Sequence, residues 1–430
     1  MRTKNYLLGA LATGLLLFTG CSNDEDITTG NGNENAAQAF VLQVASSGDG
    51  LSTRAGRPML SSEAKQTIEN VKIIICSGST VKYAKDIADW NTSGSTAYTT
   101  GGHGREKTIE IPTANKLAAG TYTVYAFGYS NSSNYDLAAI TAIGDGATSG
   151  TFNANTTLSF KTNATNKIGE EIFAGSYELT VVEGEGFKKP VVLNRQVAGT
   201  FGYVNEIPYM ADAAKLRLVA SDKNQQLVLG QFANFDLTGN GTGNDVNVKY
   251  VINGMLSSNT DKVIYSVDLA DWFTYIQDTD GDGILDDTDW AIPTAYTGAN
   301  FAKGSVFAGE FLIPFTKTAG QTFKLELTKA DGTTVLRSWN VNLPATDGQL
   351  TEYDLAKWDV SSFATSKVTD TKNVYNVVRN HLYGIGTRTL DNPTEPGKPD
   401  IDDPESLNNK QELTLRVNDN WEVIHNMDLE

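Results

Sequence analysis

A run of carboxylates with the spacing of metal ligands lies in the second half of the chain. Aspartates occupy positions 1, 3, 5, 9 and 12 of a twelve-residue calcium loop, with glycine at position 6; they are Asp278, Asp280, Asp282, Asp286 and Asp289. The carbonyl of Ile284 is the expected backbone ligand. Because Asp289 stands where the longer glutamate is usual, the sequence predicts a modest affinity for Ca²⁺. We expect a structural Ca²⁺ in an isolated loop and no catalytic cofactor; the alternative is a solvated acidic turn.

No group of residues in the sequence has the spacing of a catalytic site. The three histidines, His103, His381 and His425, share no metal-ligand spacing. Gly175-Ser176 lacks the second glycine of a nucleophile elbow. A formal net charge of −17 does not suit the neutralisation of phosphates, so nucleic acid is excluded as a partner. We therefore expect a protein that is not an enzyme.

The first residues have the pattern of a secretory signal. A positive start, a short apolar run and small residues precede Cys21. The run is too short for a spanning helix, which needs about 20 apolar residues. Phe18-Thr19-Gly20-Cys21 resembles a bacterial lipobox, whose cysteine receives a diacylglycerol, and the acidic residues at 22–26 resemble a tag for the outer face of the outer membrane. The alternative is an ordinary signal peptide with an unrelated cysteine.

The remaining cysteine, Cys76, has no partner for an internal disulfide once Cys21 carries lipid. It ends the apolar run Val71–Cys76. We expect a small buried hydrophobic residue and not a reactive thiol.

Most of the chain has the pattern of short β-strands separated by glycine and asparagine clusters. The clearest runs are 40–44, 71–76, 121–127, 177–182, 191–193, 227–229, 263–267, 307–313, 323–328 and 335–341. Asp331-Gly332 between two alternating runs predicts a hairpin. Only one short helix is expected, ending near Ile68. The sequence predicts an all-β protein of two β-sandwich domains, with a boundary near Pro208.

A proline-rich stretch at 391–411 predicts a linker before one last β segment. Leu413, Leu415 and Val417 fall on one face at period two, and Trp421 and Val423 follow. Such a strand either reaches another molecule or folds back onto its own sheet, and periodicity alone does not distinguish the two.

Several stretches together resemble the type V (Bacteroidales-type) fimbrillins, the major fimbrial subunit family. Besides the lipobox, they are Glu170–Ser176, Leu193–Gly199, Ile207-Pro208 and Val377–Tyr383. No single stretch is diagnostic, but their order matches the family over nearly the whole chain.

The resemblance implies two transthyretin-like β-sandwich domains in tandem and export as a lipoprotein. It also implies cleavage by an arginine-specific protease after the first strand, and Arg54-Ala55 is the matching bond because Arg57 precedes a proline. The expected parts are a signal peptide (1–21), a tether and propeptide with the first strand (22–54), two sandwiches (55–208 and 209–390), and a linker with the candidate donor strand (391–430).

The family implies that loss of the first strand, Phe40–Val44, opens a groove that the C-terminal strand of a neighbouring subunit fills. We therefore expect a structural subunit of adhesive cell-surface fimbriae, with other copies or related subunits as partners. The alternatives are an uncut monomeric surface lipoprotein that binds glycans, and a tip or anchor subunit that uses only one end of the exchange.

Overall fold

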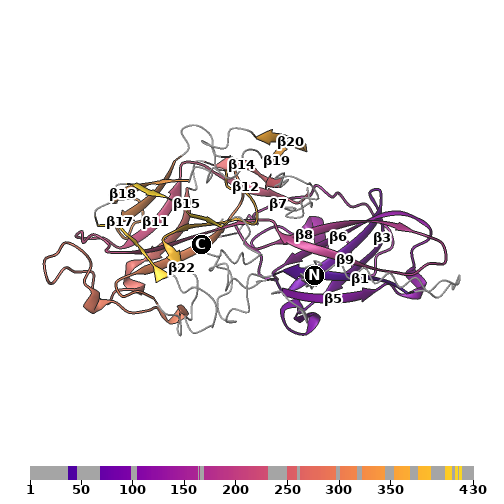
Figure 1. The fold of residues 1–430 in the computed structure, drawn as a ribbon, viewed down its shortest axis with the longest axis horizontal. Coiled ribbons are helices and arrows are strands. Elements are labelled where there is room, and N and C mark those ends of the chain that lie inside the picture. Colours follow the sequence, from indigo (N-terminus) through magenta and orange to yellow (C-terminus); the bar gives the residue numbers. More distant parts are fainter. Residues whose placement is uncertain are drawn as a thin grey trace, which may run out of the picture.

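The protein is nearly all β in its computed structural model (Figure 1). The model describes residues 37–45, 68–97, 104–162, 164, 169–230, 249–258, 262–296, 301–316, 322–343, 353–368, 376–388, 402–408, 412–414 and 416–418. The helical elements in these ranges are short: η1 (Trp90–Gly94), η2 (Thr113–Asn115), α1 (Ala138–Thr141), η3 (Leu269–Asp271), η4 (Asp287–Asp289) and η5 (Thr294–Tyr296). Over the same ranges, no helix has the length and apolar character needed to cross a membrane.

The N-terminal half is one eight-stranded sheet that folds over a shared core. In spatial order its strands are β3 (Thr80–Ile87), β2 (Asn70–Ser77), β6 (Gly120–Tyr129), β8 (Phe173–Val181), β9 (Phe187–Arg195), β1 (Gln38–Ala45), β5 (Gly104–Glu110) and β4 (Thr96–Ala97). Phe40 and Leu42 of β1 pack in the same cluster as Ile73 and Ile75 of β2, although three strands separate β1 from β2 in the sheet. The two parts of the sheet therefore face each other as the layers of a sandwich.

The outer face of this sheet is also covered. Ile74 and Cys76 of β2 belong to a second cluster, together with Phe152 from the connection between β6 and β8. The rings of Phe127 and Phe152 lie 5.6 Å apart. Because β2 is buried on both faces, its residues Ile73–Cys76 are continuously apolar and do not alternate.

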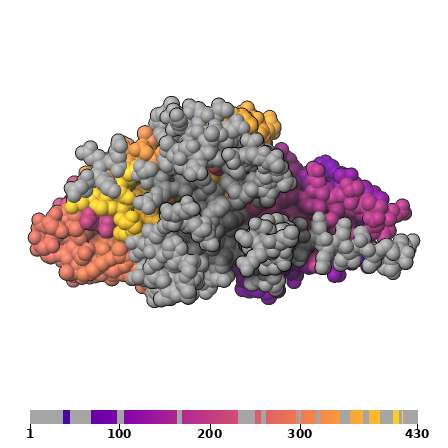
Figure 2. Space-filling view, viewed as in Figure 1, coloured from indigo at the N-terminus to yellow at the C-terminus, as the bar shows by residue number. Residues whose placement is uncertain are grey.

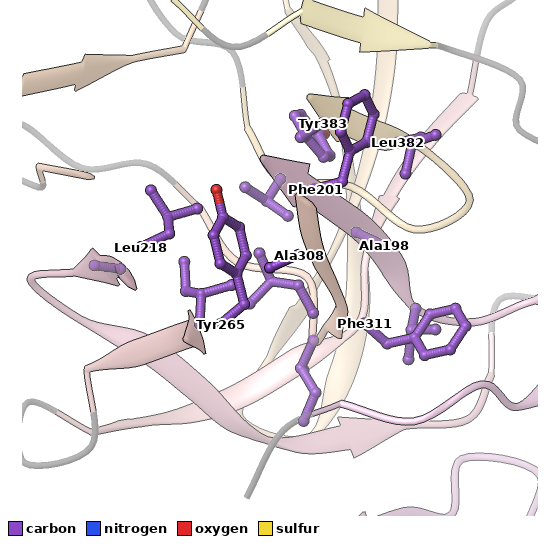
Figure 3. Close-up of a cluster of buried hydrophobic side chains, with 14 of the residues drawn as sticks. Ala198, Phe201, Leu218, Tyr265, Ala308, Phe311, Leu382 and Tyr383 are labelled. Atoms are coloured by element: carbon purple, nitrogen blue, oxygen red, sulfur yellow. The ribbon is translucent and has the colours of Figure 1, made fainter. Parts of the chain in front are cut away.

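The C-terminal half packs two further sheets around the largest core. One sheet has the order β16 (Val306–Leu312), β10 (Ala198–Asn205), β21 (Leu382–Ile385) and β26 (Arg416–Asn418), and β24 (Glu405–Ser406) also pairs with β10. The other has the order β15 (Val263–Asp268), β11 (Lys215–Ala220), β17 (Phe323–Thr328), β18 (Val335–Asn342) and β25 (Glu412–Thr414). Figure 3 shows Ala308 of the first sheet close to Tyr265 of the second, and Phe201 and Phe311 belong to the same buried cluster as Leu218 and Tyr265. Gly202 permits this approach, because a Cβ there would collide with the Tyr265 hydroxyl.

Three small sheets complete the fold. They are β14 (Gly254–Ser258) with β12 (Lys223–Val228) and β7 (Thr157–Ser159); β13 (Lys249–Ile252) with β19 (Tyr353–Asp359) and β20 (Ser362–Val368); and β22 (Thr387–Arg388) with β23 (Asp402–Asp403). Because β7 belongs to the N-terminal half and β12 to the C-terminal half, the two halves share a sheet.

The predicted all-β class, the main strand runs and the hairpin at Asp331-Gly332 are confirmed. Hydrogen bonding changes sheets between Arg195 and Ala198, ahead of the predicted boundary near Pro208. β10, placed by the sequence in the first domain, pairs instead with β16 and β21. Pro208 follows the end of β10 and does not separate the halves. The expected short helix lies mostly outside the described residues.

The predicted linker at 391–411 also needs correction. Residues 402–408 include the short strands β23 and β24, and Leu407 is completely buried. The indole nitrogen of Trp339 donates to the Leu407 carbonyl at 3.2 Å. The buried side chain of Leu407 and the hydrogen bond to its carbonyl together hold this part of the segment on the C-terminal half.

Candidate functional site

β1 is the sixth of eight strands in the spatial order of the N-terminal sheet, although it is the first strand in the described part of the chain. It pairs antiparallel with β5, with Phe40 opposite Ile109 and Val44 opposite Arg105. On its other side it pairs parallel with β9, with Val44 opposite Leu193. β1 therefore lies between β5 and β9 and is hydrogen-bonded to both. Its removal would leave one unpaired edge on β5 and one on β9, facing each other.

Alternate side chains of β1 fill the core beneath it. Phe40, Leu42 and Val44 are each 0% exposed. The ring of Phe40 lies 5.1 Å from that of Phe187. Burial of one such side chain stabilises a fold by about 1.5–3 kcal/mol. The slot that β1 fills is therefore apolar and has one pocket for every second residue.

A buried glutamine fixes the position of β1 along the slot. The amide nitrogen of Gln38 donates to the carbonyl of Leu117 at 3.0 Å, and its amide oxygen accepts from the backbone N–H of Leu117 at 2.8 Å. Gln38 is nearly completely buried. Because both polar ends of the side chain are satisfied in this register, a shift of the strand would leave buried groups unpaired.

The predicted lipidation and processing residues, Cys21, Arg54 and Ala55, lie outside the described residues. The described chain ends at Ala45 after β1 and resumes at Ile68 before β2. The expected cleavage site therefore falls in the connection that joins β1 to the rest of the sheet.

The candidate donor strand lies on the C-terminal half of its own chain. Leu413 belongs to β25, is buried, and stands opposite Val341 of β18. Val417 belongs to β26 and stands opposite Tyr383 of β21. Figure 2 shows these C-terminal residues, in yellow, beside the coral segment and away from the indigo N-terminal strands. Of the two arrangements left open by the sequence, this chain adopts the folded-back one; Leu415, Trp421 and Val423 lie outside the described residues.

A fully buried ion pair lies where the two halves meet. Glu171 Oε1 accepts from Nε and Nη2 of Arg195 at 2.8 and 2.7 Å, and both side chains are 0% exposed. The Arg195 guanidinium also lies over the ring of Phe173, 5.0 Å from its centre. These contacts hold the last residue of β9 against the first residues of β8.

The neighbouring Gln196 connects this pair to the C-terminal half. Arg379 Nη1 donates to Gln196 Oε1 at 2.9 Å, and the Asn253 side chain donates to the Gln196 carbonyl at 3.1 Å. The Asn380 backbone N–H donates to the carbonyl of Val197 at 2.9 Å. Two stretches that carried the family resemblance, Leu193–Gly199 and Val377–Tyr383, thus meet in one buried polar network. The sequence showed these motifs but not their contact.

His381 lies beside this network and is buried, as expected of a structural histidine. Its Nδ1 lies 2.9 Å from the carbonyl of Arg379, and its ring packs 5.2 Å from that of Tyr250.

The acidic loop brings three of its six predicted ligands together. Carboxylate oxygens of Asp278, Asp280 and Asp282 all lie within 4.8 Å of one another, and this is the one such group of metal-ligating residue types in the described ranges. Each carboxylate also accepts from loop N–H groups: Gly281 and Gly283 donate to Asp278 at 2.8 and 3.1 Å. The φ angles of these glycines, 78° and 85°, require a residue without Cβ strain.

Two of the other predicted ligands, Asp286 and Asp289, accept hydrogen bonds from neighbouring groups, and Ile284 lies opposite Pro208. Asp286 accepts from the hydroxyl and the N–H of Thr288, which lower the pKa of its carboxyl. Asp289 accepts from the side-chain amide of Gln277. Ile284 forms an isolated bridge with Pro208. The geometry therefore gives three converging carboxylates and a loop closed by its remaining polar groups.

An aromatic cluster fixes the chain on either side of this loop. Phe301 packs against Trp272 and Tyr296 with ring centres 5.2 and 5.6 Å apart. The Tyr203 hydroxyl accepts from the N–H of Ala302 at 2.8 Å. Because β10 supplies Tyr203, the chain that follows the loop is hydrogen-bonded to the sheet of β10 in the C-terminal half.

The sequence analysis missed Gln38, Leu117 and Glu106 as groove residues. Gln43 Nε2 donates to Glu106 Oε2 at 3.3 Å on the outer face of the sheet. A glutamine two positions before the apolar alternation of 40–44 was the available signal for Gln38, but nothing in the sequence indicates its partner, which lies 79 positions away.

No protein-family model matches the sequence, and no curated protein matches it. Among solved structures, the chain is similar to the FimA fimbrilin of Porphyromonas gingivalis W83, with 14% identity and a TM-score of 0.35 over 90% of this chain and 98% of that one. It is similar to the fimbrial anchor protein Mfa2 of Porphyromonas gingivalis, with 11% identity and a TM-score of 0.31 over 80% of this chain and 100% of that one. It is also similar to a fimbrial assembly protein of Parabacteroides distasonis, with 12% identity and a TM-score of 0.33 over 79% of this chain and 98% of that one.

Proposed function

We propose that the protein is a structural subunit of cell-surface fimbriae that polymerises by strand exchange. The observation that supports this most directly is the position of β1, which is the first described strand yet fills a central slot between β5 and β9. Cleavage after Arg54 would detach β1 from the rest of the sheet and open the slot. A strand of another subunit then satisfies the two exposed edges and fills the apolar pockets in one step.

The remaining parts of the proposal follow from the sequence. Cys21 carries the lipid that brings the precursor to the outer face of the outer membrane, and an arginine-specific protease releases the chain there. The C-terminal segment, which lies on its own C-terminal half in the uncut chain, is the strand that the next subunit receives. The assembled fibre supports adhesion.

The acidic loop is proposed to bind a structural Ca²⁺. Asp278, Asp280 and Asp282 converge closely enough for one ion to contact all three carboxylates. Bound calcium would offset their mutual repulsion and stiffen the loop at the end of the C-terminal half, without a part in catalysis.

Treatment of the precursor with an arginine-specific protease tests the polymer. We expect N-terminal sequencing to give a start at Ala55, and mild SDS to show a ladder of bands that collapses on boiling. Arg54→Ala is the control, which should remain uncut at this bond and monomeric. Deletion of residues 411–430 should abolish the ladder and leave a cut, folded monomer. A cut wild-type chain that stays monomeric contradicts the proposal and favours the monomeric glycan-binding alternative.

A further inference from the structure

The residue pattern of β1 recurs near the C-terminus. Residues 38–44 are Gln-Ala-Phe-Val-Leu-Gln-Val, and residues 411–417 are Gln-Glu-Leu-Thr-Leu-Arg-Val. In the same chain direction, glutamine, leucine and valine coincide at the first, fifth and seventh positions, and phenylalanine is matched by leucine at the third. The third, fifth and seventh positions of β1 are its three completely buried side chains.

We propose that residues 411–417 of a second copy replace β1 in the slot in the same direction and the same register. This inference rests on the proposed strand exchange and specifies its geometry. Gln411 takes the place of Gln38, Leu413 that of Phe40, Leu415 that of Leu42 and Val417 that of Val44. The occupant of the slot is therefore another copy of this chain.

The pocket of Gln38 selects the register. Both ends of this side chain bond the backbone of Leu117, at 3.0 and 2.8 Å, in a buried position. A donated strand without an amide here would leave the N–H and carbonyl of Leu117 without these partners. Gln411 is the residue that restores both hydrogen bonds, and it does so only in this register.

The outer face adds charge complementarity. Glu106 of β5 accepts a hydrogen bond from Gln43, which stands directly opposite it. Arg416 falls at the position of Gln43, so the exchange replaces a neutral donor with a cation beside the same carboxylate. Hydrogen bonds between charged groups are roughly twice as strong as neutral ones. The donated strand therefore makes a stronger interaction with Glu106 than β1, the strand that it replaces.

Two positions are less favourable. Leu413 is smaller than Phe40 and leaves space beside Phe187, whose ring contacts Phe40 in the uncut chain. Glu412 falls at the position of Ala39, between Lys188 on β9 and Glu110 on β5, so attraction and repulsion oppose each other there. Neither position changes the register that the glutamine pocket and the two aliphatic matches select.

Paired cysteines in the protease-treated polymer test the register. In the proposed arrangement, Arg416→Cys lies opposite Glu106→Cys, and Thr414→Cys lies opposite Thr108→Cys. Directly opposed side chains have Cβ atoms about 4.5–5.5 Å apart, close enough for oxidation to link them with small adjustments. We expect both pairs to convert the SDS ladder into one that survives boiling and collapses with reductant. Cleavage removes Cys21, and Cys76 is buried.

The exchanged pairings are the matched controls. If the donated strand runs in the opposite direction with Leu415 in the pocket of Leu42, the variants E106C with T414C and T108C with R416C link efficiently instead. That result overturns the proposal, as does a link within one chain. A wild-type chain that never polymerises refutes strand exchange itself, whereas a normal ladder with no link in the proposed pairs refutes only the register.

Charge reversal provides a second, independent readout. Glu106→Arg should weaken the polymer, seen as a ladder that collapses at lower temperature in SDS. Arg416→Glu should do the same, and the double variant should recover most of the wild-type collapse temperature. Lys107→Glu, on the same strand but beside Leu42 in the register, is the control and should not be rescued by Arg416→Glu. Additive losses in the double variant Glu106→Arg/Arg416→Glu contradict the proposed contact.

Discussion

Glu171 and Arg195 form a completely buried ion pair at the junction of the two halves, with one carboxylate oxygen accepting two hydrogen bonds from the guanidinium at 2.8 and 2.7 Å. The pair lies at the end of β9, the strand that borders the slot of β1, and next to Gln196, which bonds to Arg379 of the C-terminal half. A change here therefore affects both the groove and the connection between the halves.

Removal of one partner of this pair should be strongly destabilising. Arg195→Met leaves the Glu171 carboxylate buried without its cation, and losses of this kind are about 3–5 kcal/mol. The double variant Arg195→Met/Glu171→Leu should recover much of the loss, because no isolated charge remains. Urea unfolding of the full chain measures both.

The control is an exposed pair. Lys85 and Asp145 lie 3.0 Å apart with side chains 40% and 49% exposed. Lys85→Ala should cost less than about 1 kcal/mol. If Lys85→Ala and Arg195→Met lower the free energy of unfolding equally, burial does not account for the cost of breaking the Glu171–Arg195 pair.

Truncation of a buried side chain on β1 should loosen the strand in the uncut chain. Leu42→Ala removes a completely buried side chain and should lower the free energy of unfolding by about 2–5 kcal/mol. Hydrogen exchange of the amides in β5 and β9 should increase because both strands pair with β1. Val41→Ala, on the half-buried outer face, is the matched control and should have a smaller effect. If exchange increases equally in β17, the change is global and does not report on the slot.

The sequence predicts well those strands in which the pattern of apolar residues along the strand matches the faces that are buried. Phe40, Leu42 and Val44 alternate because one face of β1 is buried, and residues Ile73–Cys76 of β2 are continuously apolar because both faces are covered. β10 was assigned to the wrong half because its partner β21 comes about 180 residues later, a separation at which no local pattern gives information. The contact of Gln196 with Arg379 could not be predicted either, because the two residues are 183 positions apart.

Only part of the acidic loop could be predicted, because the spacing of residues carries local information alone. Glycine and aspartate spacing in the acidic loop predicted the convergence of Asp278, Asp280 and Asp282, which is local. It did not predict that Gln277 would hold Asp289 and that Thr288 would hold Asp286. These competing hydrogen bonds depend on the exact path of the loop, which short-range spacing does not specify.

Cys76 should be inert in the native protein. Burial raises the pKa of its thiol to about 11, so at pH 8 the reactive thiolate is nearly absent. A colorimetric thiol reagent should label protease-treated protein, which lacks Cys21, only after urea unfolds it. Fast labelling at pH 8 without urea would contradict the buried position of Cys76 on β2.

Calcium should stabilise the protein through the acidic loop. A ligand that binds only the folded state at 100 times its Kd adds about 2.7 kcal/mol, so millimolar Ca²⁺ should raise the melting temperature and EDTA should reverse the rise. Asp282→Asn removes one of three converging charges and should reduce the shift severalfold. Asp331→Asn is the control: Asp331 also accepts from turn N–H groups, those of Thr333 and Thr334 at 2.8 Å each, but lies in the hairpin between β17 and β18. This variant should melt lower than wild type and keep the full calcium shift. A shift that is absent in wild type, or equal in Asp282→Asn, leaves the loop as a solvated acidic turn.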